Sequence, residues 1–475
     1  MVPSDRRHRG IYGRCFELKM EAVRKNDRAG FLRAEAVSAF EAALRAADAE
    51  AAIVRSVRFA ESGNVLEIEN VEIPIPARTE VYSIAFGKAA TAMAKGLNRS
   101  LGNRLKRGIV SGPINGNAEL PANWSVFHGG HPEPNEDSLL AAEAAFRMLG
   151  EADKRNSIFI FLVSGGGSAM LDLPKNEGMT LADLRSVNQI LVTCGATIGE
   201  VNSVRRLISR IKGGGLSKAA GSARQVSLIV SDTNQDEAFD VASGPTILTH
   251  PPSRTEIRRI MDRYDLKERL PRAALEFIED ELQKDPENAE AQPRFFVLLD
   301  NETVIRAADE YLQRCGFVTE VAALGVVEAE IEEGCRKLVE QLSDLRSRTL
   351  PERPVAIISG GEFICPVRGS GVGGRNSEAA LRTSIHFDNL RQNEQYLQTA
   401  FLALFAGTDG IDGNSPAAGA IADDTTVRRA KAASLDPTVS LLQSDSFSFF
   451  LKLGDELTVG PTATNVRDLR VLLAF

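Results

Sequence analysis

The chain has 475 residues, of which 43% are hydrophobic and 25% are charged. This length and composition allow a core large enough for two or three domains, which excludes a disordered protein. The 56 basic and 64 acidic residues give a formal net charge of −8, so the chain lacks the cationic surplus with which proteins bind nucleic acid. No apolar run reaches the ~20 residues of a membrane-spanning helix. The sequence therefore predicts neither a nucleic-acid partner nor a membrane partner.

The five cysteines are scattered along the chain and form no C-x-x-C pair. This pattern argues against a disulfide framework and against a zinc-thiolate site, so we expect a reducing, cytoplasmic setting. The first 30 residues are rich in Lys and Arg and contain no apolar segment. They are expected to form an N-terminal extension rather than a secretory signal.

The predicted elements begin with an Ala-rich stretch, residues 34–52, whose apolar spacing indicates a helix. After it, short apolar runs alternate with helical stretches. The apolar runs lie at 81–87, 157–163, 226–232, 295–300 and 317–325. Apolar strands that alternate with helices are typical of a mainly parallel sheet covered on both faces, so the sequence predicts an α/β protein.

Glycines follow several of these strands, where backbone N–H groups and helix N-termini can face an anion. After the run at 157–163 comes the turn Ser164, Gly165, Gly166, Gly167 and Ser168. The glycines allow close backbone approach and positive φ, and the serines can donate hydroxyl groups. A tight strand-to-helix turn without a ligand is the alternative. The Walker sequence is absent, so this turn is not a P-loop. Lys88, at the start of a helix that follows the strand at 81–87, also suggests an anionic ligand, because a lysine gains nothing from the helix dipole there.

Basic residues and then carboxylates follow in the next stretch. Residues 195–220 place Arg205 and Lys212 on one face of a predicted helix, where a solvated basic face is the alternative. Asp232 and Asp236 come just after the strand at 226–232, a position suited to Mg²⁺, although a turn cap would explain either one. His131, in a loop, is at least as well explained by hydrogen bonds to backbone.

The segment 359–381 contains Gly369, Gly371 and Gly374, which satisfy the dinucleotide pattern G-x-G-x-x-G. The match is incomplete, because the acidic residue expected about 20 positions later is only loosely available as Glu394. Arg375 and Asn376 at the start of the next helix suit a carboxylate or phosphate instead, and Glu378 accompanies them.

A last glycine-rich turn follows the apolar run that begins at residue 401, and it carries Asp409 and Asp412. These acids are candidates for binding a metal or for taking a proton from an alcohol. Their spacing does not fit an EF-hand.

Eight blocks of this chain together resemble the glycerate kinases of the MOFRL-containing type, a family long labelled hydroxypyruvate reductase. The blocks run in family order from about residue 31 to the C-terminus: GKAATAM, GGHPEPNEDS, VSGGGSAMLDLP, GATIGEVNSVRR with IKGGGL, ASGPT, SGGEF with GGRNSEAAL, GTDGIDG with AAGA, and GPTATNVRDL.

The resemblance implies a Rossmann-like, doubly wound domain at 31–345 and a smaller α/β (MOFRL) domain at 346–475, with the active site in the cleft between them. It implies ATP- and Mg²⁺-dependent phosphorylation of D-glycerate, commonly at the 2-hydroxyl, and it leaves a homodimer open.

Carried over by motif, Lys88, Arg205 and Lys212 would neutralise phosphates, which the turn at 164–168 would cradle with help from Asn376 and Glu378. Arg375 would hold the substrate or the transferred phosphoryl group. Asp232, Asp236, Asp409 and Asp412 would bind metal or orient the hydroxyl.

Two departures from the family pattern, at Gln235 and around Glu328, leave a related acid such as a tetronate open as the acceptor. An NAD(P)H-dependent hydroxypyruvate reductase is the alternative activity, and a non-catalytic sugar-acid sensor is a third class. The absence of a clear His–acid pair weighs against the reductase.

Overall fold

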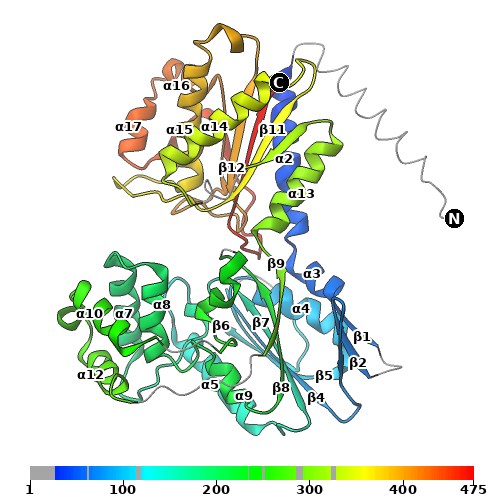
Figure 1. Ribbon diagram of the computed structural model, residues 1–475, viewed down its shortest axis with the longest axis vertical. Coiled ribbons are helices and arrows are strands. Elements are labelled where there is room, and N and C mark those ends of the chain that lie inside the picture. The colour runs from blue at the N-terminus through cyan, green and yellow to red at the C-terminus, as the bar shows by residue number, and fades with distance from the viewer. Residues whose placement is uncertain are drawn as a thin grey trace, which may run out of the picture. The chain divides into compact units, whose positions relative to one another are not determined.

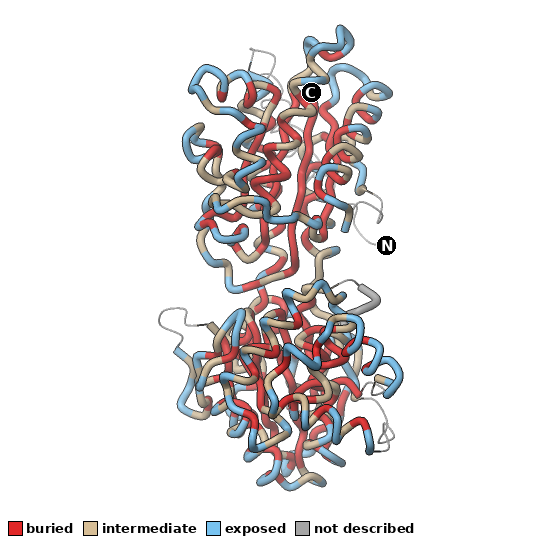
Figure 2. Tube along the Cα trace, turned by 90° about the vertical axis from the view of Figure 1, so that its left-hand side faces the viewer, coloured by how far each residue is buried: buried red, intermediate tan, exposed pale blue. Residues whose placement is uncertain are grey.

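The computed structural model describes residues 27–60, 64–113, 119–233, 235–248, 252–284, 293–322 and 328–475. Its chain divides into two compact units (Figure 1). Unit 1 contains residues 1–47, 301–462 and 466–475, and unit 2 contains residues 48–300 and 463–465. Figure 2 shows buried strands running through the middle of each unit.

Unit 2 is built on a parallel sheet of six strands in the order β6-β5-β4-β7-β8-β9. The strands are β4 (Glu80–Phe86), β5 (Leu105–Gly112), β6 (Trp124–His128), β7 (Ser157–Ser164), β8 (Arg224–Val230) and β9 (Arg294–Leu299). The chain fills one half of the sheet from β4 outward and then crosses back to fill the other half from β7, which is the doubly wound arrangement of a Rossmann-like fold. Every residue of β7 is buried, as expected for a central strand covered on both faces.

A three-stranded antiparallel sheet and the helices complete the described part of unit 2. The small sheet contains β1 (Val57–Ala60), β2 (Val65–Ile68) and β3 (Val71–Pro74). The helices are α3 (Ala49–Ser56), α4 (Ala90–Leu101), η2 (Gly102–Arg104), α5 (Glu136–Glu151), α6 (Gly167–Met170), α7 (Leu181–Thr193), α8 (Ile198–Ile208), α9 (Gly215–Ala220), η3 (Gln235–Ser243), α10 (Arg254–Arg263), α11 (Leu266–Arg269) and α12 (Arg272–Glu281).

Unit 1 has a mixed sheet in the order β10-β11-β15-β12-β13-β14. Its strands are β10 (Val318–Val321), β11 (Val355–Gly361), β12 (Phe401–Gly407), β13 (Gly419–Asp423), β14 (Glu456–Leu457) and β15 (Asp468–Ala474). The C-terminal strand β15 runs antiparallel between β11 and β12, and all its residues are buried.

Helices lie on both sides of this sheet, with α14 and α15 on one side and α2 and α13 on the other (Figure 1). The bounds in unit 1 are α2 (Arg28–Ala46), α13 (Asn301–Arg314), α14 (Ile331–Ser347), α15 (Arg375–Leu390), η5 (Glu394–Tyr396), α16 (Thr426–Ala432), α17 (Pro437–Leu442) and α18 (Ser446–Leu453).

The structure confirms the α/β class and the strands expected at 81–87, 157–163, 226–232 and 295–300, which are β4, β7, β8 and β9. The two units do not follow the boundary expected at residue 345. The run at 317–325 forms β10, which pairs in parallel with β11 and so belongs to unit 1. Helix α2 also belongs to unit 1, where Tyr311 of α13 donates a hydrogen bond to Glu35 of α2 at 2.9 Å.

The helix expected at 34–52 is instead two helices, α2 and α3. The carboxylate of Asp48 accepts a hydrogen bond from the N–H of Ala51 at 2.9 Å and so caps a new helix. Helix α2 begins at Arg28, two residues before the expected end of the N-terminal extension at residue 30. Residues 1–26 of that extension lie outside the described part of the chain. No helix in the described residues is long and apolar enough to span a membrane.

Candidate active site

The glycine turn after β7 lies beside the end of β4, at the point where the strand order of unit 2 reverses. The N–H of Lys88 donates to the carbonyl of Gly165 at 2.8 Å, and the N–H of Ala89 donates to Oγ of Ser164 at 3.0 Å. Open α/β sheets bind ligands at this reversal, outside the carboxyl ends of the strands. The topology therefore brings Lys88 and the predicted anion-binding turn to one place.

Three side chains from separate loops lie against the two central glycines of this turn. A Cβ on Gly166, whose φ is +77°, would lie 2.9 Å from Cδ2 of His131 and 3.3 Å from Cγ of Lys88. A Cβ on Gly165 would lie only 1.9 Å from Oδ2 of Asp232. We name Lys88, His131, the 164–168 turn and Asp232 the switch-point group. It combines a cation, an imidazole and a carboxylate around a glycine turn, a set that suits phosphate and its counter-ion.

A chain of hydrogen bonds fixes the end of the turn. Oγ of Ser168 lies 2.7 Å from Oγ of Ser243, and Ser243 donates to Oδ1 of Asn202 at 2.9 Å. Ser243 and Asn202 are buried. These bonds orient the Ser168 hydroxyl from behind.

Lys212 does not lie on the helix that the sequence predicted for it. Helix α8 ends at Ile208, because Ser209 turns into extended backbone and pairs with Pro174. The Lys212 ammonium is buried in an ion pair with Asp172 at 2.5 Å, and Asp172 also accepts from Ser209 Oγ at 2.6 Å. Burial lowers the pKa of Lys212, and the adjacent Asp172 opposes that shift.

Arg205 does lie on α8, where its Nε donates to Oδ1 of Asn188 at 2.8 Å. Burial lowers the pKa of its guanidinium, again against the field of Asp172. The sequence analysis missed Asp172, whose only signal was an acid inside the block VSGGGSAMLDLP. That Arg205 and Lys212 bind phosphate stays a prediction.

In unit 1, Arg375 is the first residue of α15 and is held by two carboxylates. Its Nε and Nη2 donate to the two oxygens of Asp468 at 2.5 and 3.0 Å, and Nη2 pairs with Glu362 at 2.8 Å. Burial by itself would lower the pKa of Arg375, but the charge of Asp468 outweighs it, so the pKa is raised further above its ordinary value. Arg375 is therefore a permanent cation in a fixed orientation.

Asp468 also accepts a hydrogen bond from Nδ2 of Asn376 at 3.0 Å, so it positions two of the predicted site residues. It is the main residue that the sequence analysis did not select. Its signal was the one acid in the block GPTATNVRDL, at the position where the C-terminal strand β15 begins.

Asp412 caps helix α15 from the turn after β12. Its carboxylate accepts the N–H groups of Asn376 and Ser377 at 2.9 and 2.8 Å and the Ser377 hydroxyl at 2.6 Å. Burial raises the pKa of Asp412 despite these bonds. The structure thus gives this side chain a positioning role at the helix terminus.

The neighbouring Asp409 is half-buried at the end of β12, and its Oδ1 accepts from the N–H of Ile411 at 3.1 Å. Glu378, one turn into α15, is buried and pairs with Arg368 at 3.2 Å and with Arg382 at 2.7 Å. The roles predicted for Asp409, Asn376 and Glu378 stay predictions.

The glycines of the G-x-G-x-x-G match pack against protein. A Cβ on Gly371 would lie 2.5 Å from Cβ of Asp445, and Asp445 accepts the N–H of Val372 at 2.9 Å. The strand before them, β11, is followed by a long loop and not by a tight turn into α15. This geometry differs from a dinucleotide fingerprint, in which the glycines face a pyrophosphate. A cavity of about 340 Å³ lies beside this loop, and Arg375, Glu378 and Cys365 are among its lining residues.

Of the two carboxylates predicted to bind metal, Asp232 belongs to the switch-point group, whereas the side chain of Asp236 lies outside the described residues. Within the described part of the chain, no three His, Cys, Asp or Glu side chains cluster as a metal site. One carboxylate beside a phosphate-binding turn fits Mg²⁺, which proteins commonly hold through one or two carboxylates together with substrate phosphates.

Comparison with known proteins agrees with this arrangement. Residues 35–279 match a family described as a domain of unknown function, DUF4147, and residues 355–468 match the MOFRL family. D-glycerate 2-kinase of Thermotoga maritima is 32% identical over 82% of this chain and 89% of that relative. The chain belongs to the MOFRL-containing glycerate kinase family.

Two further proteins show how this family has been described. A protein of Agrobacterium vitis named putative hydroxypyruvate reductase is also 32% identical, over 91% of this chain and 92% of that relative. The crystal structure of glycerate kinase from Thermotoga maritima superposes with a TM-score of 0.77 at 28% identity, covering 94% of this chain and all of that one. Membership in this family identifies the chain as a kinase.

Proposed function

We propose that this kinase transfers the γ-phosphoryl group of ATP to D-glycerate and forms 2-phospho-D-glycerate, with Mg²⁺ as the metal. The observation that carries the proposal is the switch-point group, in which Lys88 lies against the glycines of the turn after β7. Phosphoryl transfer depends mainly on positioning and on stabilising charge on the phosphoryl oxygens, and this group offers backbone N–H donors and a lysine for both tasks.

The chemistry of each side chain suggests its role in the reaction. Lys88 and the backbone N–H groups of the 164–168 turn bind phosphate oxygens, and Ser168 donates its hydroxyl to Ser243, whose own proton goes to Asn202. Asp232 would hold Mg²⁺, which supplies positive charge to the phosphate oxygens when bound. His131 or Asp409 would take the proton from the attacking hydroxyl, since both are polar groups near candidate phosphate-binding segments.

Arg375 binds the carboxylate of the acceptor or the transferred phosphoryl group. Its remaining N–H donors are presented in one plane because Asp468 holds Nε and Nη2. Arg205 and Lys212 would add positive charge for the phosphates, and the ion pair with Asp172 fixes the position of the Lys212 ammonium.

The test is an assay of the purified protein with ATP, Mg²⁺ and D-glycerate, in which ADP release is measured and the product is resolved as 2- or 3-phosphoglycerate. We expect ADP release that depends on glycerate and a 2-phosphate product. A 3-phosphate product would contradict the assigned hydroxyl. ADP release with a tetronate but not with glycerate would identify a related acid as the acceptor.

A hydroxypyruvate reductase is the second candidate, favoured by the name of the Agrobacterium relative and by the literal G-x-G-x-x-G pattern. The packing of Gly371 against Asp445 leaves this loop poorly suited to a pyrophosphate. NADH oxidation by hydroxypyruvate, measured in parallel with the kinase assay, distinguishes the two activities.

The cysteine pattern supports a cytoplasmic location, and the four described cysteines form no disulfide.

A further inference from the structure

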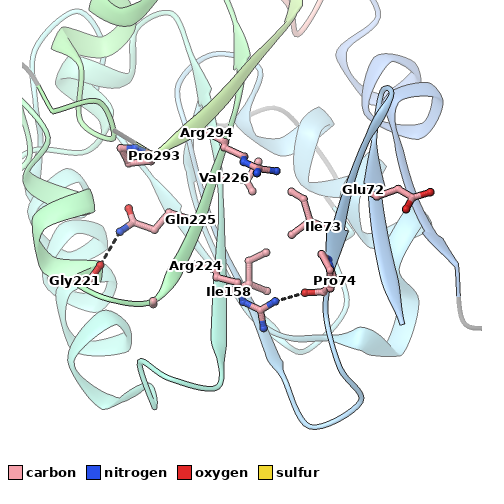
Figure 3. Close-up of a pocket in the computed structure, with 11 residues that line it drawn as sticks. Glu72, Ile73, Pro74, Ile158, Gly221, Arg224, Gln225, Val226, Pro293 and Arg294 are labelled. Carbon is pink, nitrogen blue, oxygen red and sulfur yellow. Dashed lines mark hydrogen bonds between the residues drawn. The ribbon is translucent and has the colours of Figure 1, made fainter. Parts of the chain in front are cut away.

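A second cavity, of about 520 Å³, lies in unit 2 at the edge of the parallel sheet opposite the switch-point group (Figure 3). Its lining comes from β3, from the amino ends of β7, β8 and β9 and from the turn after α9: Glu72, Ile73, Pro74, Ile158, Gly221, Ala223, Arg224, Gln225, Val226, Pro293 and Arg294. Strand β8 has seven residues, so the two edges are about 20 Å apart. The cavity is therefore separate from the proposed phosphate site.

Two arginines give this cavity a positive character. Figure 3 shows Arg294 directed from the start of β9 toward Ile73, while the carboxylate of Glu72 points away. Arg224 is tethered by its guanidinium, which donates to the carbonyl of Pro74 and, at 3.0 Å, to Oγ1 of Thr79. An arginine has five N–H donors, so this tether leaves Arg224 able to bind an anion.

Gln225 forms part of the wall but offers no polar atom to a ligand. Its Nε2 donates to the carbonyls of Ser217 and Gly221 at 3.2 and 3.1 Å, which sets the orientation of the amide. Its Oε1 is buried, so a molecule in the cavity does not reach it. The two arginines are therefore the polar groups that this cavity presents.

The remaining walls are apolar. Ile73 and Val226 are buried, and Ile158 and Pro74 extend the same surface. Ligand sites typically have volumes of roughly 300 to 1,000 Å³ and combine an apolar lining with a few placed polar groups. This cavity has that combination.

We propose that the cavity is a second ligand site, which binds a small organic anion with an apolar body. Arg294 and Arg224 bind the anionic group, and the apolar walls cover the body. A carboxylate and a phosphate share this chemistry. The proposal does not depend on the identity of the kinase substrate.

The test measures binding by calorimetry to the full-length protein. The carboxylate probe is 4-hydroxybenzoate, and the phosphate probe is 4-aminophenyl phosphate. The control 4-hydroxybenzamide has the same body as 4-hydroxybenzoate and lacks the charge. We expect at least one of the two anionic probes to bind, and the one that binds more strongly shows which acid group fits. If that group is a carboxylate, 4-hydroxybenzamide should bind about tenfold more weakly than 4-hydroxybenzoate.

Variants of the protein show whether the probe binds in this cavity. Arg294→Gln should weaken the better probe by about tenfold, because one charge-assisted contact is lost. Arg272→Gln is the matched control, since this side chain is 91% exposed on α12, and it should leave binding unchanged. Lys88→Met should leave binding unchanged, which separates this cavity from the switch-point group.

Two results would overturn the proposal. One is the absence of binding by both anionic probes at millimolar concentration. The other is binding that Arg294→Gln leaves intact or that Lys88→Met abolishes, because the probe would then occupy another site. The melting temperature of Arg294→Gln, which should equal that of the parent, shows that any loss of binding is local.

Discussion

Arg375 and Asp468 form a two-point ion pair in which Nε and Nη2 of the arginine donate to the two oxygens of one buried carboxylate. The second carboxylate on the same guanidinium, Glu362, is 38% exposed at its side chain, whereas Asp468 is 1% exposed. The buried partner sets the plane of the guanidinium, and the exposed partner is screened by water.

Asp468→Asn should therefore lower kcat/KM for the kinase reaction by roughly 10- to 100-fold, because asparagine offers one acceptor where Arg375 uses two. The matched control is Glu362→Gln, which touches the same guanidinium and should cost less than threefold. Steady-state kinetics with varied glycerate give both values. Equal losses in the two variants would show that Asp468 has no special positioning role.

Lys88→Met should reduce kcat by roughly 10²- to 10³-fold, because a cation at a developing phosphoryl charge is lost from a preorganised site. Lys95→Met, on helix α4, which begins two residues after Lys88, is the control and should retain full activity. Circular dichroism should be the same for both variants. Unchanged turnover in Lys88→Met would remove this lysine from the mechanism.

Gly165→Ala should destabilise unit 2 by about 1 to 3 kcal/mol, because the added Cβ would meet Oδ2 of Asp232 at 1.9 Å. The chain has one tryptophan, Trp124 in β6, so its fluorescence during urea unfolding reports on unit 2.

The same substitution in an Asp232→Ala background provides the control. The cost of Gly165→Ala should fall there to below about 1 kcal/mol, because the colliding carboxylate is gone. An undiminished cost would place the strain in the backbone of the turn instead of in the contact with Asp232.

Cys365, which lines the cavity beside α15, should react slowly with iodoacetamide near neutral pH. Burial raises the pKa of its thiol to about 12, and the charge of Glu378 adds to the shift. A raised thiol pKa leaves little thiolate below that pH, so the alkylation rate should climb about tenfold per pH unit between pH 8 and 11. Peptide mass spectrometry resolves this cysteine from the others.

Glu378→Gln should increase the reaction rate of Cys365 at pH 8, because removal of the neighbouring negative charge lowers the pKa of the thiol. Gln keeps the size of the side chain, which makes it a fair comparison. A rate that levels off below pH 9 in the parent protein would contradict the raised pKa.

The sequence by itself determined the α/β class, the central strands and the glycine turn of the proposed phosphate site. Each of these depends on local pattern: a continuous apolar run specifies a buried strand, and glycines after it specify a turn with exposed N–H groups. The charged blocks also identified the family, because their order along the chain is itself a sequence property.

Only the tertiary structure decided which partners the charged side chains have in ion pairs and hydrogen bonds. Local spacing places Lys212 on a helix face, but the pairing of Ser209 with Pro174 ends that helix. The Lys212 ammonium therefore lies against Asp172, 40 positions earlier in the sequence. The sequence predicts Asp412 as an acid that binds metal or accepts a proton, and only the structure shows that its carboxylate also caps a helix that begins 37 positions before it. Asp468 was missed because its partner Arg375 is 93 positions away and β15 brings the two together. Such pairs are fixed by strand register and packing, which no local pattern encodes.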